Sequence, residues 1–317
     1  MNPQGSKAFL QPIRQFLVCL DLTDIDAYLI RYAASLARTL SVERVIFFHV
    51  IQAYDLPDRA DKSFPDVETE LRDLIRKNLL KSVDDFFKTE CHWEIETRVG
   101  YEDAAKEVIG YIQESGSDLT LLGQKYGENR QARYSRKILT ETACDILFVP
   151  QITSVSLQPV VCAVDFSEES GSAFEKALDI SRAEAGSMSC YFVSDPTRAY
   201  FPATTQRSSD RDLRRFQETY EQFLKNYGLS PDDIPCRIEL HEAISSEAEA
   251  IHQAASEQNA RLIVVGARGD AAKMTSLFGN LCETFRIMEK ELPVMLVKPQ
   301  PRKKTSWFRK GRSWTRE

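Results

Sequence analysis

The sequence contains an internal repeat, and this repeat constrains the fold more than any other feature. The run FLVCLD, which ends at Asp21, has its counterpart in VVCAVD, which ends at Asp165, 144 residues later. Solid apolar runs of this length are typical of parallel strands that are buried on both faces. Because stretches with strand and helix periodicity follow in the same order in both copies, the chain is predicted to form two similar domains in tandem.

Strand-like and helix-like stretches alternate in each copy, which predicts parallel strands joined by right-handed helical crossovers. The third strand of each copy alternates apolar and polar residues, as exposed edge strands do. Each copy is thus predicted to be a doubly wound α/β domain with a five-stranded parallel sheet. The expected strands are 16–21, 45–50, 93–99, 118–123 and 144–150, then 160–165, 189–193, 236–240, 261–266 and 293–299. The long helix before strand 93–99 is expected to bury Val67, Leu71, Leu74, Ile75, Leu79, Val83 and Phe86.

Length and composition agree with two globular domains, since the chain has 317 residues, of which 43% are hydrophobic and 28% charged. We expect a first domain at residues 14–151, a second at 158–299 and a tail at 300–317. The seven cysteines form no C-x-x-C pair and no cluster with histidine, which disfavours a metal site and predicts a reducing, cytoplasmic location. The sequence shows neither an apolar run long enough to span a membrane nor the order of a signal peptide.

Aspartate and glycine residues mark the strand ends at which a ligand would bind. In a doubly wound sheet, ligands lie outside the carboxyl ends of the strands, where the strand order reverses. Asp21 and Asp165 end the first strands, and Gly123 and Gly266 end the fourth. The second copy continues as G-A-R-G, then nine residues, then Gly279 at the start of a predicted helix. Such glycines let backbone N–H groups approach an anion, and the helix adds its positive end; alternatively, they only end a strand and cap a helix.

This pattern resembles the universal stress protein family, and the resemblance covers both copies. Gly266, Gly269 and Gly279 have the family's G-2x-G-9x-G spacing, and Asp165 and Val193 match its strand-end positions. The resemblance implies a Rossmann-like, adenine nucleotide hydrolase-like fold with strand order 3-2-1-4-5, and ATP with Mg²⁺ as the ligand. The residues it assigns to the adenine side are Ala163, Val164, Asp165 and Val193, and those it assigns to the ribose and phosphates are Val265, Gly266, Gly269, Gly279, Asn280, Leu281 and Cys282.

Both copies depart from the family's pattern. Asn280 stands where the family has Ser or Thr, and Cys282 replaces a second hydroxyl. An amide still donates a hydrogen bond but a thiol donates weakly, and each lost bond would weaken phosphate binding by roughly 1–3 kcal/mol. The first copy reads GQKYG from Gly123 and lacks the later glycine, so we expect a degenerate site there, serving as a structural partner or binding a different anion. Around its expected position stand Lys125, Arg133, Ser135, Arg136 and Lys137.

These features favour a binding protein over an enzyme. The sequence has no nucleophile elbow and no Walker lysine motif, and Ser167 is more typical of a helix cap than of a nucleophile. The first hypothesis is a stress-response or regulatory protein whose second domain binds an adenine nucleotide without efficient catalysis. The alternative is a nucleotide-independent protein-interaction module with both sites degenerate. A third hypothesis is an enzyme of the adenine nucleotide hydrolase type.

Charge and assembly suggest further partners. The net charge is −6, but residues 301–317 carry seven Lys and Arg against one acid, which leaves −12 on the rest and disfavours nucleic-acid binding by the domains. The tail also contains Trp307, Phe308 and Trp314, a composition that suits an anionic membrane or nucleic acid, or else a disordered solubilising tail. The resemblance implies an intramolecular pseudo-dimer through strands 146–149 and 294–297; a homodimer and an unidentified protein partner remain open.

Overall fold

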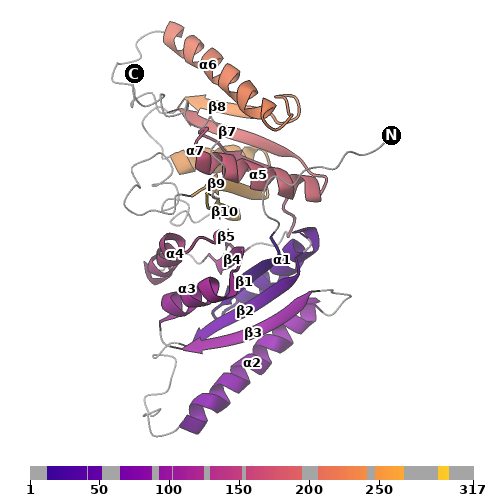
Figure 1. Ribbon diagram of the computed structural model, residues 1–317, viewed down its shortest axis with the longest axis vertical. Coiled ribbons are helices and arrows are strands. Elements are labelled where there is room, and N and C mark those ends of the chain that lie inside the picture. The colour runs from indigo at the N-terminus through magenta and orange to yellow at the C-terminus, as the bar shows by residue number, and fades with distance from the viewer. Residues whose placement is uncertain are drawn as a thin grey trace. The chain divides into compact units, whose positions relative to one another are not determined.

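The computed structural model describes residues 13–40, 42–51, 65–87, 93–101, 103–124, 129–151, 155–194, 206–240, 247–267 and 292–299. Contacts within the chain divide it into two units, with the main break between Ser156 and Leu157. Each unit contains a sheet of parallel strands with helices on its faces (Figure 1), which confirms the predicted α/β class. Within the described ranges, no helix is both long and apolar enough to cross a membrane.

The first half contains β1 (Gln15–Leu20), α1 (Ile25–Leu40), β2 (Arg44–Ile51), α2 (Pro65–Phe87), β3 (Glu94–Tyr101), α3 (Ala104–Ser115), β4 (Leu119–Gly123), α4 (Asn129–Glu141) and β5 (Asp145–Val149). Its strands lie in the order β3-β2-β1-β4-β5, and all the pairs are parallel. This is the order that the family resemblance implies. It leaves β3 at the edge, as the alternating sequence predicts, whereas β1, β4 and β5 are almost entirely buried.

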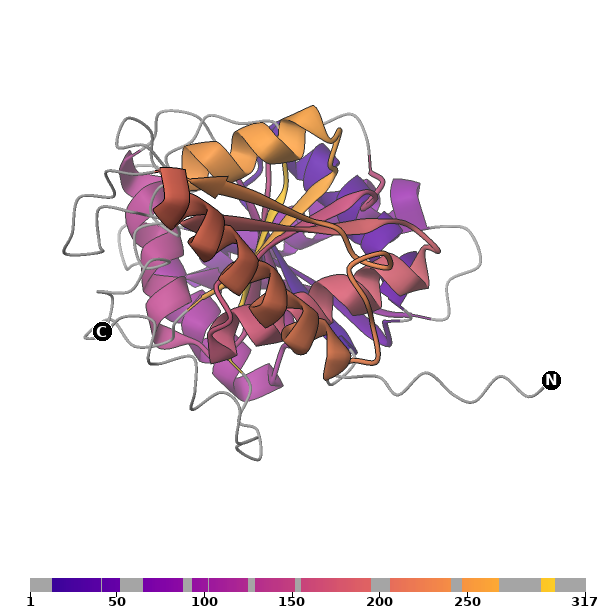
Figure 2. The same ribbon diagram turned by 90° about the horizontal axis from the view of Figure 1, so that it is seen from above.

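The second half contains β6 (Val160–Ala163), α5 (Glu168–Ala183), β7 (Met188–Ser194), α6 (Gln206–Lys225), β8 (Cys236–Leu240), α7 (Glu247–Glu257), β9 (Leu262–Gly266) and β10 (Val294–Val297). The strand order is β8-β7-β6-β9-β10, again 3-2-1-4-5, with parallel pairing of β6 to β7 and β9 and of β7 to β8. Figure 2 shows α7 on one face of this sheet and α5 and α6 on the other, so the sheet is covered on both faces.

The core of the first half differs from the prediction along α2. Its buried apolar positions repeat every fourth residue, at Leu79, Val83 and Phe87. Phe87 packs edge-on against Phe47 and Trp93, with 5.5 Å between ring centroids in each pair. Leu74 and Phe86, which we expected in the buried stripe, are 56% and 37% exposed, so the prediction was wrong at these two positions. The packing of Phe87 sets the rotation of the helix, and this turns Phe86 away from the sheet.

The core of the second half is built around seven aromatic side chains, which we call the aromatic cluster. Phe166 follows β6, and its ring centroid lies 5.4–5.7 Å from those of Phe192, Phe216 and Phe223. Aromatic pairs at such distances contribute beyond the apolar area that they bury. α6 is therefore fixed to the sheet mainly by ring contacts. The members of the cluster are Phe166, Phe174, Phe192, Phe216, Tyr220, Phe223 and Tyr227.

Candidate functional site

The carboxyl ends of β6, β7 and β9 lie side by side and bring six predicted site residues to one edge of the second sheet. Ala163 pairs with Tyr191 on β7, and Cys162 pairs with Val264 on β9. Beyond these pairs β7 continues to Ser194 and β9 to Gly266, and Val164 and Asp165 directly follow β6. The predicted positions therefore lie at the same edge of the sheet. The residues that meet at this edge are Ala163, Val164, Asp165, Val193, Val265 and Gly266.

The side chains at this edge differ in what they can offer a ligand. Ala163, Val164 and Val265 are at most 1% exposed, so they belong to the core and could reach a ligand only through their backbones. Asp165 is half-buried and contributes the charge. Five predicted residues, Gly269, Gly279, Asn280, Leu281 and Cys282, lie outside the described residues, and so does the side chain of Val193.

Asp165 is held in a tight turn between β6 and α5. Its Oδ1 atom accepts hydrogen bonds from the backbone N–H of Ser167 at 2.9 Å and from the Ser167 hydroxyl at 2.5 Å. Phe166 between them has a φ of 60°, in the left-handed region. The Ser167 hydroxyl in turn accepts from the N–H of Ser170 at 3.2 Å, which confirms that Ser167 caps α5. The carboxylate is thus fixed at the strand edge by the helix cap.

The same turn occurs after β1 in the first half. The Thr23 hydroxyl donates to Oδ1 of Asp21 at 2.5 Å, and Leu22 has a φ of 61°. Asp26 adds a contact of its own, because its carboxylate accepts from the backbone N–H groups of Asp21 at 3.1 Å and Leu22 at 2.8 Å. Sequence reasoning missed this turn, although the pattern D-x-(S/T) after an apolar strand in both copies could have indicated it.

The first half departs from the family's pattern in the segment after β4. α4 begins at Asn129, so the segment expected to hold a glycine loop is helical, and Ser135 lies within the helix and is buried. Tyr134 on α4 forms a hydrogen bond with Cys19 near the end of β1. Burial, together with the Cys19 thiol and the Asp21 carboxylate, raises the pKa of Tyr134 well above its ordinary value. Burial likewise raises the pKa of Cys19 to about 12, so both groups are neutral at pH 7.

Gly123 at the end of β4 has a packing role. A Cβ atom at this position would lie 3.1 Å from Cδ1 of Leu29 and 3.2 Å from Cγ2 of Ile25, both on α1. The glycine therefore lets α1 approach β4 closely, which supports the interpretation that it serves the fold. Of the four cationic residues expected nearby, Lys137 lies 3.9 Å (Nζ to Oδ2) from Asp103; the side chains of Lys125, Arg133 and Arg136 lie outside the described residues.

The chemistry of the described side chains offers little besides carboxylates at these edges. His49, near the end of β2, has its Nδ1 atom 2.9 Å from the carbonyl oxygen of Leu20, a structural contact between neighbouring strands. His252 lies on α7, within hydrogen-bonding distance of the Ser256 hydroxyl. In the part of the chain that the structure describes, no group of three or more potential ligands could hold a metal ion.

Comparison with known proteins points to one family. The sequence profile of the Universal stress protein family matches residues 156–298. A universal stress protein from Archaeoglobus fulgidus DSM 4304 has a similar structure, with a TM-score of 0.65 and 17% identity over 90% of this chain and 96% of that chain. A functionally unknown protein from Pseudomonas aeruginosa PAO1 is also similar, with a TM-score of 0.61 and 16% identity over 90% of this chain and 93% of that chain. No curated protein sequence matches. At 16–17% sequence identity, the similarity to these two structures shows that this chain shares their fold.

Two doubly wound sheets with the strand order 3-2-1-4-5, each with an aspartate turn after its first strand, define a two-domain α/β protein of Rossmann-like architecture. The second domain, residues 156–298, matches the sequence profile of the universal stress protein family. The first domain has the same strand order and the same turn, and after its fourth strand α4 begins at Asn129.

Proposed function

We propose that the second domain binds an adenine nucleotide, ATP with Mg²⁺, at the carboxyl ends of β6, β7 and β9. The turn that holds Asp165 carries this proposal. It fixes a half-buried carboxylate next to the point where the strand order reverses, which is where ligands of doubly wound sheets bind. Gly266 at the neighbouring strand end, followed by the G-2x-G-9x-G spacing, supports a phosphate position beside it.

The residues at this edge fit the parts of such a ligand. A carboxylate only accepts hydrogen bonds, so Asp165 would accept one from the exocyclic amine of adenine, and Ser167 would keep it oriented. Gly266 and the glycines after it would bring backbone N–H groups to the phosphates. Asn280 would donate through its amide, and Cys282 would contribute less because a thiol is a weak donor. Bound Mg²⁺ would be coordinated chiefly by phosphate oxygens and water.

We further propose one nucleotide per chain. In the first domain Tyr134 lies against Cys19 and close to Asp21, and α4 extends through the segment that would have to wrap the phosphates. Beyond the first turn of α4, backbone N–H groups are bonded to carbonyl groups four residues earlier, so those around Ser135 cannot bind an anion. The first domain would then serve as a structural or regulatory partner.

We propose that the bound nucleotide is sensed and not efficiently hydrolysed. The Ser167 hydroxyl accepts from the N–H of Ser170 and donates to Asp165, so it caps α5 and orients the carboxylate. The sequence has no Walker lysine motif that would place a cation on the phosphates. Nucleotide occupancy would therefore act as a signal for a regulatory protein.

Thermal unfolding of the full chain with and without ATP and Mg²⁺ tests this proposal. Ligand at 100 times its Kd stabilises a binding domain by about 2.7 kcal/mol, which corresponds to a rise in Tm of roughly 5–10 °C. We expect Asp165→Ala to abolish this rise. Asp21→Ala, which removes the equivalent carboxylate of the first domain, is the matched control and should leave the rise intact.

Three results would count against parts of the proposal. No rise in Tm with ATP, ADP, AMP or GTP would favour a nucleotide-independent interaction module. An equal loss of the rise in both variants would point to a site other than the Asp165 turn. Release of ADP from ATP at a rate that Asp165→Ala abolishes would show that the domain is an enzyme.

A further inference from the structure

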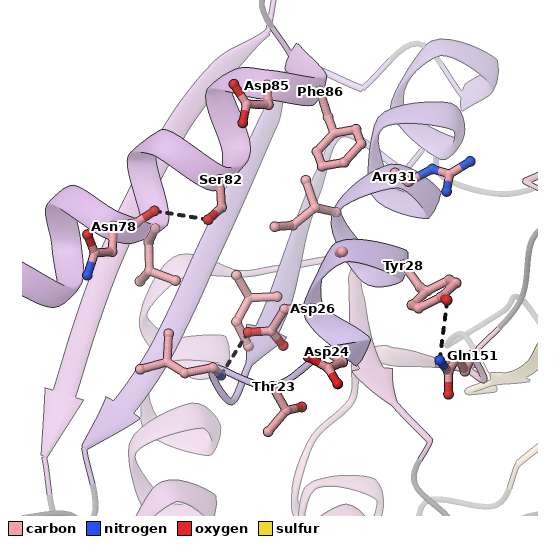
Figure 3. Close-up of a pocket in the computed structure, with 15 residues that line it drawn as sticks. Thr23, Asp24, Asp26, Tyr28, Arg31, Asn78, Ser82, Asp85, Phe86 and Gln151 are labelled. Carbon is pink, nitrogen blue, oxygen red and sulfur yellow. Dashed lines mark hydrogen bonds between the residues drawn. The ribbon is translucent and has the colours of Figure 1, made fainter.

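The first domain contains an open groove between α1 and α2, with a volume of about 840 Å³ (Figure 3). Two apolar side chains that line it are exposed, Leu22 at 50% and Phe86 at 37%, and Phe86 points from α2 toward α1 in Figure 3. These are two of only four large hydrophobic side chains that are exposed within the described residues. Two solvated apolar side chains in one groove mark a place where a partner could bury apolar area.

The second domain shows which side chains suit such a groove. Phe166 occupies the position equivalent to Leu22, between the aspartate and the hydroxyl residue of the turn, with nearly the same φ. Phe166 is only 6% exposed, because its ring packs against Phe216 and Phe223 on α6, the counterpart of α2. Aromatic rings therefore fill, in the second domain, the space between turn and helix that the first domain leaves open.

The rim of the groove is acidic. Asp24, Asp26 and Asp85 line it together with one cation, Arg31. The carboxylate of Asp26 accepts from two backbone N–H groups of the turn, so its position is fixed at the groove. Asp24 and Asp85 are exposed and Asp26 is half-buried, and carboxylates at a groove favour a basic partner by charge complementarity.

We propose that this groove binds a basic segment that inserts an aromatic side chain beside Leu22 and Phe86, and that residues 301–317 of this chain are such a segment. Seven Lys and Arg against one Glu complement the acidic rim. Trp307, Phe308 and Trp314 supply the type of ring that fills the equivalent space in the second domain. Large aromatic side chains in a hydrophobic pocket are common anchors of protein interfaces.

Binding of a fluorescein-labelled peptide of residues 301–317, followed by anisotropy, tests this proposal on the full chain with its own Trp307, Phe308 and Trp314 replaced by alanine, so that its tail does not compete for the groove. A peptide in which the three aromatic residues are alanine keeps its charge and is expected to bind at least about tenfold more weakly. Asp85→Lys in the protein should weaken binding about threefold to tenfold. Asp84→Lys, on the same helix but outside the groove, is the matched control and should change binding little.

A second pair of variants separates apolar contact from charge. Phe86→Ser should weaken binding, whereas Leu80→Ser, at 38% exposure on the same helix and outside the groove, should not. If circular dichroism shows that Asp85→Lys is misfolded, Asp85→Asn takes its place. If Phe86→Ser is misfolded, Leu22→Lys takes its place. Equal binding to the groove and control variants would overturn the proposal, because it would reveal general attraction to an acidic protein. The proposal would also be overturned if the peptide did not bind the protein, whether or not the peptide bound vesicles of anionic phosphatidylserine.

Discussion

Leu22 and Phe166 occupy the same place in the two domains, and replacing each by glycine separates backbone strain from packing. Both have a φ near 60°, where a non-glycine residue costs about 1–2 kcal/mol. Glycine removes this strain, but its freedom in the unfolded chain costs about 0.4–1 kcal/mol. The two backbone effects leave a net gain of about 0–1.6 kcal/mol, which is the same at both positions because their φ angles are nearly equal. The difference between the two variants in the free energy of unfolding should therefore follow the side chain that is lost.

The exposed fractions give the expected difference. Phe166 is 6% exposed and packed among aromatic rings, so its removal should destabilise by about 3–5 kcal/mol. Leu22 is 50% exposed, so about half of the 1.5–3 kcal/mol of a fully buried leucine is lost, or about 1 kcal/mol. We expect Phe166→Gly to destabilise the second domain by about 2–5 kcal/mol net, and Leu22→Gly to leave the first domain within about 1 kcal/mol of the wild type.

Urea unfolding measures both effects. Far-UV circular dichroism follows the whole chain. Fluorescence follows the first domain, if Trp307 and Trp314 are replaced by phenylalanine so that only Trp93 emits. Phe166→Leu is the control, because it gives the second domain the leucine that the first domain has at the equivalent position, Leu22. Destabilisation by Leu22→Gly of more than about 2 kcal/mol, or by Phe166→Gly of less than about 1 kcal/mol, would refute the reasoning.

Three further predictions concern single groups. Ser167→Ala should lower the free energy of unfolding by about 1 kcal/mol through loss of the α5 cap, measured by urea unfolding. Gly123→Ala should destabilise by about 1–3 kcal/mol because its Cβ would crowd α1, whereas Gly110→Ala, with no atom within 4 Å, should stabilise by up to about 1 kcal/mol; equal effects would contradict the packing role. Burial raises the pKa of Cys190 to about 12, so this thiol should resist iodoacetamide at pH 8 until urea is added. Because the unfolded thiol ionises near its ordinary pKa of 9.0 and the folded one does not, stability should fall as pH rises from 9 toward 12; a flat profile would contradict the burial.

Much of the fold could be predicted from the sequence, because its signals are local. The solid apolar run before Asp165 forms β6, and the alternating run from Cys236 to Leu240 forms the edge strand β8. The helix cap at Ser167 was also predictable, since capping depends on residues within one turn. The exposure of Phe86 was not predictable, because a rotation of the helix decides which of two adjacent residues faces the core.

The candidate site could be predicted in part. Asp165 and Gly266 were expected at strand ends, and the sheet brings both to one edge because parallel strands end on the same side. The turn around Asp165 was missed, since its left-handed residue is a phenylalanine and not the glycine or asparagine that usually marks that conformation. The glycine loop from Gly269 to Gly279 lies outside the described residues and stays a prediction.

By itself, the sequence determined that this protein contains two doubly wound α/β domains, each with an aspartate after its first strand. Only the tertiary structure decided how the two domains differ. In the first domain Tyr134 forms a hydrogen bond with Cys19, 115 residues earlier in the chain. Phe166 packs on Phe216, whereas Leu22 at the equivalent turn borders an open groove. These differences depend on contacts between residues far apart in the chain, which no local pattern of polarity records.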